Sequence, residues 1–105
     1  VFVVGLMLAA AANSQTNNQR EALILNVLGV SQFKKGEYAE ALSSLNRAIE
    51  LYPTAPAFHS NLGHVYRELE DLARSEIAFR KSNEIQPDNA ITLNQLGVVL
   101  MEANV

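Results

Sequence analysis

Apolar residues recur at steps of three and four along most of the chain, and polar residues fill the positions between them. The pattern is clearest over residues 38–52, where one apolar stripe consists of Tyr38, Ala41, Leu42, Leu45, Ala48, Ile49 and Tyr52. This spacing places the apolar side chains on one face of an α-helix. Similar patterns predict further helices over residues 22–34, 56–70 and 71–84, and from residue 90 onward. No stretch alternates at period two for long enough to predict a strand, so we expect an all-α fold.

The turns between these helices also have a sequence signal. Gly36 interrupts the pattern between the first two helices and favours a left-handed cap. Pro53 and Pro87 end the second and fourth helices, because proline cannot donate the backbone hydrogen bond of a continuing helix. Asp88 or Asn89 is expected to cap the fifth helix.

The chain also repeats itself at a spacing of 34 residues. The same dipeptide stands near the middle of three helices, as Leu28-Gly29, Leu62-Gly63 and Leu96-Gly97. A repeat of this length is typical of helical solenoids, in which each helix pair must stack on a neighbour to bury its apolar face. Residues 20–105 therefore form a repeat region, with full units at 22–55 and 56–89 and a partial unit at 90–105.

These positions resemble the tetratricopeptide repeat family. In the first unit the signature residues are Leu28, Gly29, Ala41, Leu45, Ala48 and Pro53, with Gly36 and Tyr38 at the turn. In the second unit they are Leu62, Gly63, Tyr66, Phe79 and Pro87, and in the third Leu96 and Gly97. The resemblance implies a right-handed α-solenoid of antiparallel helix pairs that binds proteins and holds no cofactor.

Some positions depart from the family pattern, mostly in the second unit. Polar or charged residues replace the expected small, aromatic or apolar ones at Gln32, Glu70, Ser75, Ser82 and Asn83. We therefore expect the second unit to be less tightly packed than the first, in which Leu28 and Leu45 fill the gap around Gly29. Residues 22–34 are apolar on nearly every side, which predicts a helix covered on more than one face.

The resemblance implies a binding groove lined by the first helix of each pair. By position, that face consists of Asn26, Val30, Phe33, Ser60, His64, Arg67, Asn94, Val98 and Met101. Asn61 occupies the position at which long superhelical members of the family hold a peptide backbone, whereas Asn26 and Asn94 are displaced by one. Only Arg67 could contribute to a clamp for a terminal carboxylate. Phe33 and Met101 are the favoured contacts, since exposed apolar side chains mark interaction sites.

The first twelve residues are uninterruptedly apolar or small and end in four alanines. Residues 1–12 therefore read as part of a secretory signal peptide, and the polar residues 13–19 as a flexible linker. Two alternatives are a truncated membrane anchor, completed by residues upstream, and a buried helix of the solenoid. The first reading predicts an exported protein and a chain cut within its signal.

The composition mainly excludes certain partners and kinds of site. The net charge is −3, and the eight basic residues are dispersed, which argues against a nucleic-acid partner. Without cysteine the fold has neither disulfides nor thiolate metal sites. His59 and His64 are five residues apart and cannot share a metal on one helix, and we expect His59 to pack between repeats. The acidic residues Glu68, Glu70 and Asp71 are expected to be solvated and to cap the next helix.

We therefore expect a protein–protein interaction scaffold without a catalytic, cofactor or metal site, whose partner is a protein or a peptide. The alternative is the non-catalytic recognition arm of a larger enzyme, such as a glycosyltransferase or peptidase, with its catalytic domain outside this chain. Membrane contact is expected only if residues 1–12 form an uncleaved anchor. Self-association through the last helix is a further possibility.

Overall fold

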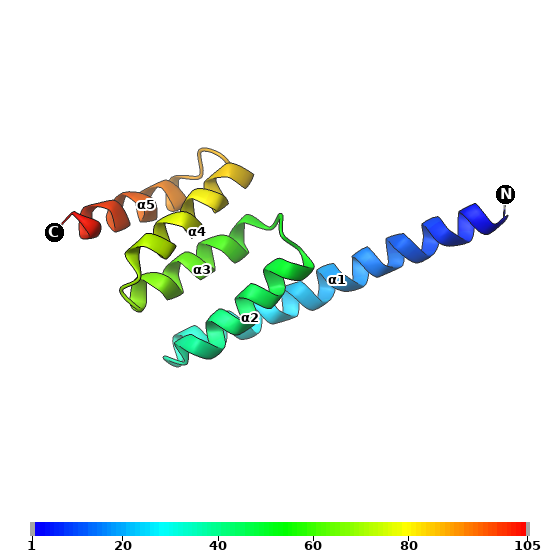
Figure 1. Cartoon of the computed structure of the whole chain (residues 1–105), viewed down its shortest axis with the longest axis horizontal. Coiled ribbons are helices and arrows are strands. Elements are labelled where there is room, and N and C mark those ends of the chain that lie inside the picture. Colours follow the sequence, from blue (N-terminus) through cyan, green and yellow to red (C-terminus); the bar gives the residue numbers. More distant parts are fainter. Residues whose placement is uncertain (1, 105) are drawn as a thin grey trace.

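A computed structural model describes the backbone of residues 2–104 and the side chains of residues 15–104. Helices make up nearly all of this part of the chain, as α1 (Phe2–Lys34), α2 (Tyr38–Leu51), α3 (Pro56–Glu68), α4 (Leu72–Ile85) and α5 (Ala90–Ala103). They run back and forth in order, and each packs beside the next (Figure 1). The N-terminal part of α1 extends beyond the stack, and the Cα extents are 63 × 30 × 18 Å. The predicted all-α solenoid and its helix boundaries, to within two residues from α2 onward, are confirmed.

Short turns separate the helices, and three of these turns contain a residue with a positive φ. Gly36 has a φ of +80°, as the sequence predicted, and Glu70 occupies the corresponding place in the next unit with a φ of +62°. The Asp71 carboxylate accepts a hydrogen bond from the Arg74 amide at 3.1 Å and caps α4. Asn89 does the same for α5, because its side-chain oxygen accepts from two amides of the first turn. Each of these helices therefore ends, and the next begins, within a few residues.

The core lies between consecutive helices. One cluster joins α2, α3 and α4 through Ala41, Leu45, Leu62, Val65 and Ala78. A second surrounds Phe58 where α1, α2 and α3 meet, and a third surrounds Phe79 between α4 and α5. Burial of this apolar surface is the main favourable term that holds the stack together.

Two glycines allow the helices of each pair to approach closely. A Cβ atom built on Gly29 would lie 2.8 Å from Leu45 Cγ, and one on Gly63 would lie 2.8 Å from Phe79 Cε2. Neither contact is possible for a real Cβ atom without movement of its neighbour. The glycines are therefore needed for the approach of the helices, although both lie in helices, where glycine is unfavourable.

The prediction of a flexible linker over residues 13–19 is wrong for the backbone. Residues 13–19 are helical and continue α1 without a break, although the side chains of 15–19 are exposed. No glycine or proline stands in this stretch, so no residue in it stops a helix. The side chains of residues 1–14 lie outside the described ones, and the signal peptide and the anchor stay predictions. Within the described residues, no helix is long and apolar enough to cross a membrane.

Two expectations about inward-facing residues are also wrong. Leu28 is 46% exposed on the outer side of α1, together with Leu23, Ile24 and Val27, so that helix is covered on fewer faces than expected. In α5 the spacing of Leu93, Leu96, Gly97 and Leu100 predicts that these residues face inward. The buried residues are instead Thr92, Leu96 and Val99, whereas Leu93 is exposed and no atom lies within 4 Å of a Cβ built on Gly97. These faces are open because no described helix lies beyond α1 or α5 in the stack. Pairing of α5 with another copy stays a prediction.

Candidate functional site

The groove residues come from the first helix of each unit. Helix α1 contributes Asn26, Val30 and Phe33, α3 contributes Ser60, Asn61, His64 and Arg67, and α5 contributes Asn94, Val98 and Met101. All except Asn94 and Met101 are partly buried, as expected for side chains on the walls of a hollow. The structure brings the residues of α1 and α3 together, and it leaves the three from α5 further along the stack.

A cleft of about 220 Å³ lies between α1, α2 and α3, and we call it the α1–α3 cleft. It is lined by Val30, Phe33, Lys34, Leu45, Asn61, His64 and Val65. Four of these residues were predicted for the groove. Leu45 and Val65 complete its apolar floor and were missed, because the resemblance assigned the groove by position on the first helices. The only sequence signal for these two residues was their position on the apolar stripes of α2 and α3.

Two asparagines meet beside this cleft. The Asn61 Nδ2 group donates a hydrogen bond to Asn26 Oδ1 at 2.8 Å. In the sequence, Asn26 is displaced by one position from the place that Asn61 occupies in its own repeat. Their separation of 35 residues instead brings them into direct contact across α1 and α3. Asn94 of α5 is exposed and does not extend the pair.

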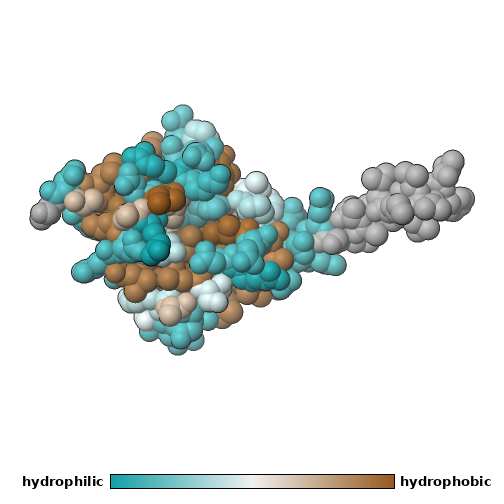
Figure 2. All heavy atoms as spheres, viewed as in Figure 1, coloured by the Kyte–Doolittle hydropathy of each residue, from teal (hydrophilic) through white to brown (hydrophobic). Residues whose placement is uncertain are grey.

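A second hollow, of about 280 Å³, continues from Asn61 and His64 toward α5. It is lined by residues of α3, α4 and the start of α5, among them Ser60, Ser82 and Ile91. The hydroxyls of Ser60 and Ser82 lie 2.7 Å apart and share a hydrogen bond. This hollow is more polar in lining than the α1–α3 cleft, so the groove changes character along the stack. Figure 2 shows apolar and polar surface alternating on the face that it presents.

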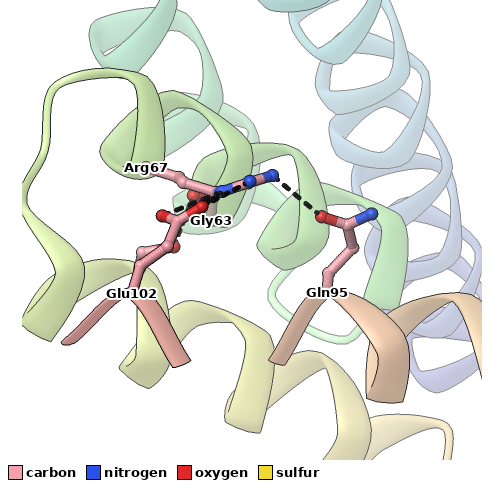
Figure 3. Close-up of polar contacts among 5 residues, drawn as sticks. Gly63, Arg67, Gln95 and Glu102 are labelled. Atoms are coloured by element: carbon pink, nitrogen blue, oxygen red, sulfur yellow. Dashed lines mark hydrogen bonds and ion pairs between the residues drawn. The ribbon is translucent and has the colours of Figure 1, made fainter. Parts of the chain in front are cut away.

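Arg67 is held by an ion pair with α5. Its Nε donates to both carboxylate oxygens of Glu102, and its Nη2 donates to Oε1 at 2.6 Å. The Nη1 group lies 3.4 Å from Gln95 Oε1 (Figure 3). The hydrogen bond to Glu102 raises the pKa of Arg67, and the same bond lowers the pKa of Glu102. The only arginine that could have served a carboxylate clamp is therefore already bound to a carboxylate of the same chain. Neither partner was predicted from the sequence.

The His64 side chain lines the groove and is uncharged at neutral pH. Its ring packs against that of Phe79, with centroids 5.2 Å apart and nearly perpendicular planes. Burial lowers the pKa of His64, and the nearby charge of Arg67 lowers it further, while Glu68 acts in the opposite direction. The other histidine is buried, and its Nε2 group donates to the carbonyl of Pro53 at 2.9 Å, so His59 packs between the repeats as predicted.

Among residues 15–104, no three His, Cys, Asp or Glu side chains lie close enough together to hold a metal ion. Of the predicted acidic cluster, Asp71 caps α4, and Glu68 and Glu70 are exposed at the turn. The groove therefore offers binding contacts, namely apolar walls, two amides and a neutral imidazole.

Comparison with known proteins identifies the repeats. A TPR repeat model matches residues 29–69, and a tetratricopeptide repeat model matches residues 57–89. The chain is 30% identical over 74 residues to Protein CTR9 homolog of Arabidopsis thaliana, and 36% identical over 67 residues to Anaphase-promoting complex subunit CDC16 of Saccharomyces cerevisiae. These matches cover 70% and 57% of this chain but only 7% and 8% of the two relatives.

Solved structures share the fold. The second TPR of Spaghetti (RPAP3), bound to the HSP90 peptide SRMEEVD, has a TM-score of 0.83 at 17% identity and covers 88% of this chain and 84% of its own. The first TPR of the same protein, with the same peptide, has a TM-score of 0.79 at 21% identity, covering 82% and 70%. The Arabidopsis OM64 TPR domain also has a TM-score of 0.79, at 17% identity, covering 82% and 71%.

Proposed function

The chain belongs to the tetratricopeptide repeat family, and from this premise we propose that it is a protein–protein interaction scaffold. Its ligand is an extended peptide or a segment of a partner protein, which lies in the groove along α1, α3 and α5. Side chains of the first helices hold the ligand, and the chain itself carries out no reaction.

One observation carries the proposal. Val30 and Phe33 of α1 and Asn61 and His64 of α3 line a single cleft on the surface, although they are far apart in the sequence. Such a cleft combines apolar walls with a few polar groups, which is the usual composition of a ligand site. That structural neighbours of the same fold bind the peptide SRMEEVD supports a peptide as the class of ligand.

The proposal extends to the protein that contains this chain. Because the chain spans less than a tenth of the two curated relatives, the scaffold is proposed as part of a larger protein. Export of that protein is supported by the apolar run of residues 1–12 alone. In the alternative, the repeats are the recognition arm of an enzyme, and the groove serves the same binding role there.

Selection from a display library of random 16-residue peptides on the immobilised chain tests the proposal. Enriched peptides are expected to lose at least about tenfold in affinity on Val30→Trp, which fills the α1–α3 cleft, a change of about 1.4 kcal/mol. Ile24→Trp is the matched control, since Ile24 lies on the same helix, is 68% exposed and does not line the cleft. Enriched peptides that bind the Val30→Trp variant as tightly as the parent chain would contradict the proposal.

A further inference from the structure

We infer that the α1–α3 cleft is a subsite for one uncharged, apolar side chain of the ligand, of the size of leucine to phenylalanine. The inference rests on the proposed peptide-binding function and names the chemistry of the residue that the groove recognises. It sets this groove apart from one that captures an acidic or carboxylate-terminated peptide.

The walls of the cleft are built for an apolar group. Val30, Phe33, Leu45 and Val65 line it from three helices, and Leu45 and Val65 are almost completely buried. Phe33 also packs on Tyr38 with ring centroids 5.7 Å apart, which supports its side chain from behind. The cleft volume of about 220 Å³ exceeds the roughly 150 Å³ of an engineered apolar cavity that binds benzene. A leucine or phenyl side chain therefore fits.

The charges around the cleft disfavour an anionic group inside it. No acidic residue lines the cleft, and Lys34 is the only basic residue of its lining. Lys34 is exposed, so water screens its charge. His64 has a lowered pKa and is neutral at pH 7, and Arg67 is bound to Glu102. A buried carboxylate would therefore have only the exposed Lys34 as a charge partner to offset its loss of hydration.

The asparagine pair beside the cleft suits the backbone of the same ligand residue. The bond between Asn61 Nδ2 and Asn26 Oδ1 uses one donor and one acceptor of the pair. An asparagine side chain has two donors and an acceptor with two lone pairs. Asn61 Oδ1 and the Asn26 amide group are thus left to accept from and donate to a peptide unit. An extended ligand with its apolar side chain in the cleft presents such a unit at this point.

Small capped amino acids test the subsite without a known ligand. N-acetyl-leucine-N-methylamide is titrated into the isotope-labelled 105-residue chain, and the methyl and amide resonances are followed by NMR. We expect saturable shifts centred on Val30, Val65 and His64, with an affinity in the millimolar range. N-acetyl-glycine-N-methylamide has the same backbone and no side chain, and it is expected to bind at least about tenfold more weakly.

Two variants show whether the NMR shifts arise from binding in the α1–α3 cleft. Val30→Trp is expected to abolish the saturable shifts, whereas Ile24→Trp on the outer side of α1 leaves them intact. Circular dichroism of both variants checks that the helices are retained. If the Val30→Trp variant does not fold, Asn61→Ala replaces it and is expected to weaken the leucine probe while the helical signal is unchanged.

Other results overturn the inference. Equal binding of the glycine and leucine probes would show that the cleft takes no side chain. Tighter binding of N-acetyl-aspartate-N-methylamide would show a charged subsite instead. Failure of the leucine probe, while library peptides still bind and depend on Val30, would leave the scaffold function in place and remove the subsite alone. A leucine probe that binds when no library peptide does would remove the scaffold function instead.

Discussion

In the first helix pair, α1 and α2 meet mainly through apolar and small side chains, with one hydrogen bond between the helices, from the Ser44 hydroxyl to Gln32 Oε1 at 2.7 Å. Leu45 lies over Gly29, and Ala41 and Ala48 flank it one turn away on each side, with all three α2 side chains completely buried. The alanines let the two backbones approach, and the leucine fills the remaining space. Contact of this kind depends on shape and on the removal of apolar surface from water.

In the second helix pair, α3 and α4 meet through a larger ring and two hydroxyls. Phe79 replaces Leu45 and lies over Gly63, while serines stand at the positions of the two alanines. The Ser75 hydroxyl donates to the carbonyl oxygen of Gly63 at 2.8 Å, and Ser82 bonds Ser60 at 2.7 Å. Both serines are as buried as the alanines that they replace.

The comparison shows that one backbone arrangement tolerates two kinds of contact. The sequence led us to expect looser packing in the second pair, and this is not found at Ser75 and Ser82, because their hydroxyls are hydrogen-bonded and a larger side chain lies between them. Burial of a polar group is costly only when it has no partner. Among the described side chains, the second pair has one buried polar atom without a partner, because Oδ1 of Asn83 is buried and makes no hydrogen bond.

Substitution of alanine for a helix glycine is expected to have the largest effect on the difference between the two pairs. Gly63→Ala forces a Cβ into the rigid ring of Phe79, and we expect a loss of about 1–3 kcal/mol from overpacking, reduced by about 1 kcal/mol of helix propensity. Gly29→Ala meets Leu45, whose smaller and more flexible side chain moves more easily, so the loss is smaller. Unfolding by urea, followed by circular dichroism, measures both.

The third glycine provides the control for this series. A Cβ built on Gly97 has no atom within 4 Å, so Gly97→Ala is expected to stabilise the chain by up to about 1 kcal/mol. Alanine is therefore expected to destabilise the chain at Gly29 and Gly63, which face a partner helix, and to stabilise it at Gly97, which faces none in the described structure. A destabilised Gly97→Ala variant would show that the α5 face is covered in solution, for example by another copy.

Removal of the serine hydroxyls gives a smaller effect and separates the two kinds of contact. Ser75→Ala removes a buried bond to a backbone carbonyl, and a loss of about 0.5–1.5 kcal/mol is expected. Ser82→Ala leaves only Ser60 unpaired, and this residue is partly exposed and can bond to water, so the loss should be less. Thermal unfolding of both variants checks the order. A stabilised Ser75→Ala would mean that the alanine of the first pair is the better choice in both.

The repeat period predicted the fold because it depends on helix spacing and turn chemistry, both of which are local. Gly36, Pro53 and Asn89 act within a few residues of their own positions, and the helix boundaries followed from them. The candidate site was predicted less well, since it depends on contacts between units. The bond between Asn26 and Asn61 and the ion pair between Arg67 and Glu102 join residues 35 apart. Which side chains meet at such a distance follows from the rotation of one unit on the next.

The smallest expected effect is a pH dependence confined to the second unit. His64 stands where the first unit has Val30, and its pKa is lowered by burial and by the charge of Arg67. The unfolded chain, with an ordinary histidine pKa near 6.5, therefore binds a proton before the folded chain does. Stability is accordingly expected to fall as the pH decreases below about 6.5, and to level off below the pKa of the folded state. Urea unfolding between pH 8 and 5 measures this slope, and His64→Gln should flatten it.

The acidic partner in the neighbouring ion pair does not share this pH range, because the pKa of Glu102 is lowered from 4.5 and its contribution to stability is lost only in more acidic solution. Stability that instead increases below pH 6.5, with a slope that His64→Gln removes, would mean that the folded groove holds the imidazole in its charged form. The cleft would then favour an anionic ligand group over an apolar one.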